Sequence, residues 1–153
     1  PAREETVLPC RPVGGGSDNL SHGGEREMAQ RGEIYQCGKQ GLLVEVLTPA
    51  DCTLQCCGEE MAALTANTQD AAVEKHVPAI ERNGSTIRVQ VGSVAHPMDP
   101  DHWIEFIEVL DGDCLQRKYL HPGDAPVAEF TVCGSAVTVR EHCNKHGLWK
   151  AEG

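Results

Sequence analysis

The chain has 153 residues, which is enough for one ordinary domain or for two small ones. Its 23 acidic residues outnumber its 13 basic residues and give a formal net charge of -10. Nucleic-acid binding depends on neutralising phosphates with Lys and Arg, so this balance argues against DNA or RNA as a partner. No apolar run approaches the roughly 20 residues that a membrane-spanning helix needs, so we expect no membrane association.

Eight cysteines and seven histidines are the most informative feature of the composition. The N-terminal residues lack the charged-then-apolar pattern of a secretory signal, which favours a cytoplasmic, reducing environment where structural disulfides are rare. Thiolate and imidazole together suit iron, zinc or copper better than magnesium or calcium. The composition therefore predicts a protein that binds a transition metal.

Residues 1–27 are rich in glycine and proline and show no hydrophobic period that could pack, so we expect a disordered extension. Met28 follows directly, and Gly23-Gly24-Glu25-Arg26 is what a purine-rich ribosome-binding site would encode if translated. Two interpretations stay open. The segment is either a genuine flexible extension or a gene-start artefact, with the natural protein beginning at Met28.

Residues 28–63 form a short, cysteine-rich segment with one apolar stretch, from Leu42 to Leu47. Units below about 40 residues usually need a metal, disulfides or a partner chain to stay folded. We therefore expect a small domain that depends on a metal, and its lack of a core also favours a homodimer.

The thiols of this segment are spaced as in a damaged metal site. Cys37 opens a turn whose second ligand position holds Gln40, and Cys56-Cys57 supplies a second pair of sulfurs. Two such turns of cysteines can hold iron or zinc in a tetrahedral thiolate site. Cys52 lies nearby as a possible fourth sulfur, and a metal-free remnant is the alternative interpretation.

Residues 64–153 show the short apolar-polar alternation of β-strands, after a predicted short helix at Asp70–Lys75 that Pro78 ends. Strands are predicted at Ile87–Val91, Ile104–Leu110, Leu115–Leu120, Val127–Val132 and Ala136–Arg140. Turn signals separate them at intervals near the roughly 8–12 residues typical of a sandwich. The pattern predicts a mainly β fold, with an antiparallel β-sandwich of six or seven strands.

The same region carries five candidate metal ligands: His76, His96, His102, Cys143 and His146. His96 and His102 flank a proline-containing turn, while Cys143 and His146 form a C-x-x-H step. Each histidine taken singly is also compatible with a surface or hydrogen-bonded role, so spacing alone leaves both interpretations open.

Seven short motifs are recognisable as a set: Tyr35-Gln36-Cys37-Gly38, Cys56-Cys57-Gly58, Glu74-Lys75-His76-Val77-Pro78, Gly92-Ser93-Val94-Ala95-His96-Pro97-Met98, His102-Trp103-Ile104-Glu105, Pro122-Gly123-Asp124-Ala125-Pro126 and Cys143-Asn144-Lys145-His146-Gly147-Leu148-Trp149. In order and spacing, from Met28 to Ala151, they resemble desulfoferrodoxin, the two-domain superoxide reductase family. The resemblance implies a small desulforedoxin-like domain (28–63) followed by an immunoglobulin-like antiparallel β-sandwich (64–153) that carries a mononuclear non-haem iron.

The resemblance also assigns roles. It implies equatorial ligation by Nε2 of His76, His96 and His102 and by Nδ1 of His146, with Cys143 as the axial ligand. Glu74 and Lys75 resemble two residues beside the iron, where Lys75 would attract superoxide and Glu74 would bind the oxidised iron. The alternative for this pair is a solvated loop dipeptide.

The family's second iron site has four cysteines, of which Cys37, Cys56 and Cys57 match three while Gln40 replaces the fourth. A second iron or zinc is therefore in doubt. The implied reaction is one-electron reduction of superoxide to hydrogen peroxide without O₂ production, for antioxidant defence, with rubredoxin or a similar small carrier as electron donor. The alternatives are a non-catalytic zinc or iron module and an electron-transfer protein.

Overall fold

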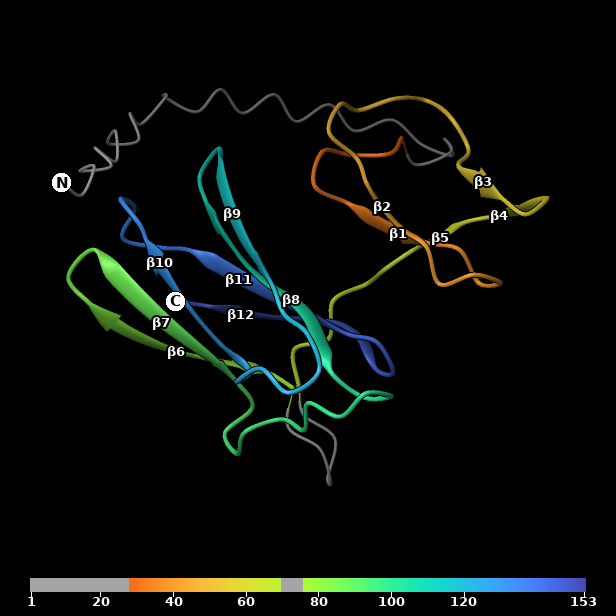
Figure 1. The fold of residues 1–153 in the computed structure, drawn as a ribbon. Helices are drawn as coiled ribbons and strands as arrows, with labels where there is room; N and C mark the ends of the chain where they lie inside the picture. The colour runs from red at the N-terminus through yellow and green to blue at the C-terminus, as the bar shows by residue number, and fades with distance from the viewer. Residues whose placement is uncertain (1–27, 70–75) are drawn as a thin grey trace, which may run out of the picture. The chain divides into compact units, whose positions relative to one another are not determined.

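The computed structural model describes residues 28–69 and 76–153 (Figure 1). The predicted extension over residues 1–27 and the predicted helix at Asp70–Lys75 lie outside the described residues. The described residues form strands, turns and loops without a helix, and so they contain no helix that could span a membrane. The described residues fall into two compact units, one within residues 28–65 and the other within residues 66–153.

The smaller unit is built from very short strands. They are β1 (Ile34–Gln36), β2 (Leu43–Glu45), β3 (Gln55–Cys56), β4 (Glu59–Glu60) and β5 (Ala62–Ala63). One sheet has the order β2-β1-β5, and β3 pairs with β4 as a separate hairpin. The buried apolar side chains of this unit are few: Ala29, Ile34, Cys37, Val46 and Met61. This cysteine-rich, core-poor unit agrees with the prediction of a desulforedoxin-like domain.

The larger unit is a sandwich of two antiparallel sheets. Its seven strands are β6 (Pro78–Asn83), β7 (Thr86–Val91), β8 (Ile104–Asp111), β9 (Cys114–Tyr119), β10 (Val127–Thr131), β11 (Thr138–Cys143) and β12 (Gly147–Glu152). The first sheet has the order β10-β7-β6 and the second the order β12-β11-β8-β9 (Figure 1). The prediction of a mainly β chain with an immunoglobulin-like sandwich is confirmed.

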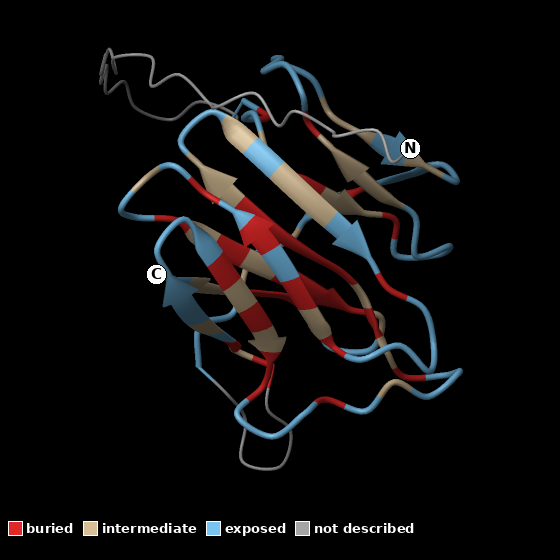
Figure 2. Ribbon diagram, turned by 60° about the vertical axis from the view of Figure 1, so that its left-hand side comes forward, coloured by how far each residue is buried: buried red, intermediate tan, exposed pale blue. Residues whose placement is uncertain are grey.

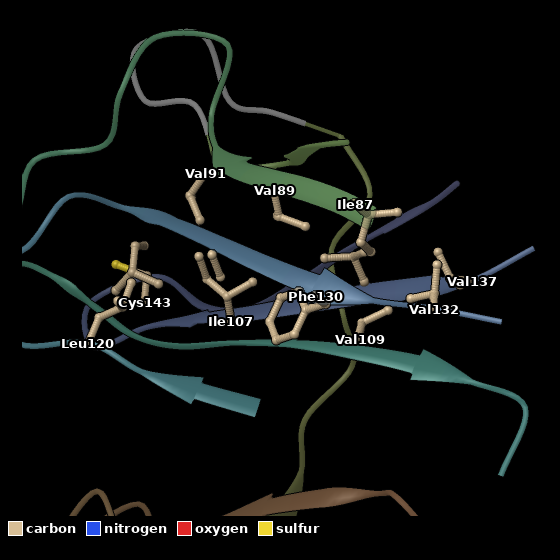
Figure 3. Close-up of a cluster of buried hydrophobic side chains, with 13 residues drawn as sticks. Ile87, Val89, Val91, Ile107, Val109, Leu120, Phe130, Val132, Val137 and Cys143 are labelled. Atoms are coloured by element: carbon tan, nitrogen blue, oxygen red, sulfur yellow. The ribbon is translucent and has the colours of Figure 1, made fainter. Parts of the chain in front are cut away.

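The core lies between the two sheets and follows the alternation of the strands. Ile87, Val89 and Val91 are inaccessible to solvent, whereas the residues between them are only partly buried. Bands of buried and less buried residues alternate along strands of the sandwich (Figure 2). They pack in one cluster with Ile107 and Val109 of β8 (Figure 3). Side chains two residues apart share one face of a strand, and each one fully buried contributes about 1.5–3 kcal/mol.

The five strands expected from alternation are present, with small shifts at their ends. The alternation of apolar and polar residues did not predict β6 or β12, because neither strand has an alternating apolar face. β6 begins at a proline and exposes most of its residues at the edge of its sheet, while β12 begins at Gly147 immediately after a candidate ligand. β11 also runs to Cys143, three residues beyond the predicted end at Arg140.

A register shift at the end of β11 controls which side chains face the core. Cys143 pairs with Ile104 and His142 with Phe106, so Glu105 is an additional residue in β8. Such a bulge re-aims the side chains that flank it. Cys143 consequently joins the core cluster, whereas His142 lies on the opposite face and its Nδ1 is 2.8 Å from a carboxylate oxygen of Glu105.

Candidate metal centre

Five side chains from three segments of the chain meet at one end of the sandwich. His76 directly precedes Val77 and β6, His96 and His102 lie in the connection between β7 and β8, and Cys143 ends β11. His146 lies in the turn that leads into β12. One ligand atom from each of the five lies within 4.8 Å of every other. The structure therefore brings together all five ligand candidates of the sandwich.

Three of the distances between the four nitrogen atoms match the edges of a square. Nε2 of His76 lies 3.0 Å from Nδ1 of His146 and 3.1 Å from Nε2 of His96, and Nε2 of His102 lies 3.2 Å from Nδ1 of His146. Nitrogens bound about 2.0–2.1 Å from one ion at right angles would be about 2.9 Å apart. These are also the nitrogen atoms that the family resemblance implied, so the donor set fits a single metal ion.

Cys143 approaches this square from the protein core. Its Sγ lies 3.6 Å from Nε2 of His96 and 3.5 Å from Nδ1 of His146, and the residue is inaccessible to solvent. His146, in contrast, is exposed. The sulfur thus comes from the buried side of the cluster, while solvent reaches the cluster beside His146.

Hydrogen bonding and stacking orient two of the imidazoles, those of His96 and His76. Nδ1 of His96 is 2.5 Å from the carbonyl oxygen of Pro97, and donation of its proton there leaves the Nε2 lone pair for a metal. The Trp149 ring stacks on His76 with centroids 4.7 Å apart and an interplanar angle of 15°. Nε1 of Trp149 donates to the carbonyl oxygen of His146 at 3.2 Å. One tryptophan thereby positions two of the candidate ligands.

Comparison with known proteins shows the family. Residues 68–152, more than half of the chain, match the family model described as Desulfoferrodoxin. The chain belongs to the desulfoferrodoxin family. The desulfoferrodoxin of Nitratidesulfovibrio vulgaris is 50% identical over 125 residues, covering 82% of this chain and 99% of that protein. A desulfoferrodoxin homolog of Archaeoglobus fulgidus is 50% identical over 119 residues, covering 78% of this chain and 95% of the homolog.

A solved structure supports the same relationship at the level of the fold. The superoxide reductase from Treponema pallidum matches with a TM-score of 0.63 and 29% identity, over 83% of this chain and 99% of the other. Membership of the desulfoferrodoxin family and the five converging donors identify the cofactor as a mononuclear non-haem iron. Imidazole and thiolate are suitable ligands for such an iron. The family and the superoxide reductase neighbour show that the protein is an oxidoreductase.

Asn144 joins the two loops that carry most of these donors, and the sequence analysis did not single it out. Its backbone N–H donates to the Trp103 carbonyl at 3.2 Å, and its Oδ1 accepts from the Trp103 N–H at 3.0 Å. Its Nδ2 donates to the Asp101 carbonyl at 3.1 Å. Lys145, hydrogen-bonded to the Asp101 carboxylate at 3.1 Å, lowers the pKa of that group. An Asn beside a ligand in a turn is a signal for such bonding.

We expect Asn144→Ala to weaken iron retention by about tenfold, since loss of groups that orient metal ligands typically costs about 10–100-fold in affinity. The measurement is the rate of iron loss to a chelator from the purified protein. Lys145→Ala is the matched control, because it removes only the ion pair between exposed side chains at Asp101. Equal rates of loss from Asn144→Ala and the unmodified protein would contradict the role of Asn144.

The smaller unit holds a second cluster, formed by the sulfurs of Cys37, Cys56 and Cys57 within 4.8 Å of one another. Hydrogen bonds lower the pKa of Cys37, although its burial acts in the opposite direction. The largest effect comes from the Cys56 thiol, and smaller ones come from the backbone N–H groups of Gln40 and Lys39. Hydrogen bonding to Cys37 and Cys57 raises the pKa of Cys56 to about 12.

Cys52 and Gln40 do not complete this cluster. Among the residues that the structure describes, the group of mutually close ligand atoms contains three sulfurs and excludes Cys52, which is exposed. Gln40, also exposed, contributes no sulfur. Glu74 and Lys75 lie outside the described residues, so their roles beside the iron stay predictions.

Proposed function

We propose that this protein is a superoxide reductase, converting superoxide, one electron and two protons into hydrogen peroxide without releasing O₂. The observation that carries the proposal is the convergence of four imidazole nitrogens and one thiolate on one point. A structural neighbour from Treponema pallidum is a superoxide reductase. Five donors also argue against a closed zinc site, which normally has four ligands.

An iron held by His76, His96, His102, Cys143 and His146 would supply one-electron redox chemistry. The protein side chains set the conditions for that chemistry. Neutral imidazoles and one thiolate leave a small net positive charge on the ferrous site, which suits an anionic substrate. As a ligand on the buried side, Cys143 would donate electron density to such an iron and favour its ferric state.

Solvent access also suits the reaction. His146 is exposed, so superoxide and protons can reach the centre and peroxide can leave it. The one-way character of the reaction distinguishes it from dismutation, which must also oxidise superoxide to O₂.

Lys75 and Glu74, directly before His76 in the sequence, are the proposed catalytic residues. Lys75 offsets the repulsion that a chain of charge -10 presents to superoxide, and local positive potential can raise on-rates by about 10–10³. Glu74 is the proposed carboxylate ligand of the oxidised site once peroxide has left.

We expect Lys75→Ala to slow the bimolecular reaction with superoxide about tenfold at low ionic strength and less at high ionic strength, because salt screens the attraction. Stopped-flow rates across a salt series measure the effect. Lys118→Ala, on β9, is the control for loss of a positive charge elsewhere. A salt dependence unchanged in Lys75→Ala would refute the role of Lys75.

The remaining parts of the proposal concern organisation. A rubredoxin or a similar small carrier supplies the electron, the protein works in the cytoplasm as an antioxidant, and two chains associate as a homodimer. The proposed domains are residues 28–63 and 64–153, preceded in the sequence by the segment of residues 1–27.

The decisive experiment mixes the reduced, iron-loaded protein with superoxide generated by pulse radiolysis and measures both products. Reduction yields one peroxide for each superoxide consumed and no O₂. Dismutation yields one peroxide and one O₂ for every two superoxides. Either the dismutation ratio or the absence of accelerated superoxide loss would overturn the proposal.

A further inference from the structure

We propose that Cys37, Cys56 and Cys57 form a three-thiolate zinc site whose fourth ligand is water. This site is separate from the iron centre of the sandwich and does not depend on the function proposed for that centre. It also differs from the four-cysteine iron site that the family resemblance implies, since one of the four positions is Gln40.

The spacing of the sulfurs fits the ion. The three Sγ atoms lie within 4.8 Å of one another, and those of Cys56 and Cys57 are 3.6 Å apart. Sulfurs bound about 2.3 Å from a tetrahedral zinc would be separated by about 3.8 Å. The pair therefore already has nearly the separation that a shared zinc ion requires.

The backbone holds two consecutive cysteines in a conformation that directs both sulfurs to one point. Successive side chains of an extended chain face opposite sides, which would separate the two sulfurs. Cys57 instead has a φ of 54°, in the left-handed region that residues other than glycine rarely adopt, and Gly58 follows with a φ of 78°. A residue other than glycine that is held in this backbone conformation indicates a functional constraint on the turn.

The turn that carries Cys37 is held closed by a backbone hydrogen bond. The Gly41 N–H donates to the Cys37 carbonyl at 2.9 Å, and Gly41 has a φ of 68°. Nζ of Lys39 lies 2.8 Å from a carboxylate oxygen of Glu59, which joins this turn to the one that carries Cys56 and Cys57. This ion pair thus holds the two turns together, in addition to the contact between their sulfurs.

The donor set favours zinc over iron. Mononuclear iron–sulfur sites use four thiolates, whereas zinc also forms open sites with three protein ligands and one water. Cys37 is buried and Cys57 exposed, so water can reach the cluster beside Cys57 as a fourth ligand. Cys52 is not within ligand distance of this group.

The test uses the full chain with iron already loaded and all thiols reduced under anaerobic conditions. Zn²⁺ is titrated against a chromophoric chelator, while a thiol reagent counts the protected cysteines. We expect one tightly bound Zn²⁺ per chain, protection of three thiols and no loss of iron. Cys37→Ser should weaken zinc binding by more than about 100-fold, because a direct ligand matters more than the outer groups whose loss costs about 10–100-fold.

Two further variants keep the test decisive even if Cys37→Ser disturbs the fold. Cys52→Ser, which removes an exposed cysteine of the same unit, should bind zinc like the unmodified chain. Gln40→Cys should acquire a stable ferric four-thiolate centre with its visible absorption. Zinc binding that survives Cys37→Ser, or a four-sulfur iron spectrum in the unmodified chain, would each overturn the proposal.

Discussion

Replacement of Cys143 by serine is expected to abolish the visible thiolate-to-iron absorption of the oxidised protein and to slow superoxide reduction by more than about 100-fold. Loss of groups that only orient metal ligands costs about 10–100-fold, and Cys143 is proposed to be a ligand itself. Serine also removes the electron-rich sulfur that lies on the buried side of the four nitrogens. Visible spectra and pulse-radiolysis rates of the iron-loaded protein measure both effects.

Cys133→Ser provides the matched control, since Cys133 is exposed and belongs to neither cluster of candidate ligands. It should retain the absorption band and the rate. Persistence of the band in Cys143→Ser would show that another sulfur produces it, and an unchanged rate would remove the thiolate from the reaction.

A second large effect is expected away from the iron, at the buried Glu108. Glu108 is inaccessible to solvent and accepts hydrogen bonds at 2.6 Å from Nε of Arg117 and Nε of Arg140, with a second nitrogen of each arginine also contacting its carboxylate. Glu108→Ala should lower the free energy of unfolding by about 3–5 kcal/mol, because it leaves two largely buried guanidinium groups without their counter-charge.

Urea denaturation followed by tryptophan fluorescence measures this change, since both tryptophans belong to the sandwich unit. Glu81→Ala is the control: Glu81 is exposed and lies 3.7 Å from Arg88, so its loss should cost less than about 1 kcal/mol. Equal destabilisation by the two substitutions would show that burial of the Glu108 pair contributes nothing to stability.

The strand pattern was predictable where one face of a strand enters the core. Ile87, Val89 and Val91 alternate with polar residues in the sequence and lie between the sheets in the structure. Edge strand β6 carries no such signal, because most of its residues contact solvent. The ion pairs of Glu108 were not predictable either, since they depend on which residues of β9 and β11 lie opposite β8.

The metal centre could be predicted only in part from residue spacing. A local C-x-x-H step is visible in the sequence, but His76 and His146 lie 70 positions apart and meet only through the fold. The resemblance to a family supplied the ligand set that spacing left open. Trp149 and the Pro97 carbonyl also orient the imidazoles of His76 and His96. These contacts depend on the folded backbone and could not be predicted from hydrophobic periodicity.

The donors of the iron centre come from both layers of the sandwich. His76 precedes β6 and His96 follows β7 in one sheet, while Cys143 and His146 belong to the hairpin of β11 and β12 in the other. An ion held by all of them acts as a clasp between the layers. Free iron at 1,000 times the dissociation constant of the site would stabilise the folded chain by about 4 kcal/mol. The concentration of free iron in the cell would therefore govern how long each molecule escapes proteolysis.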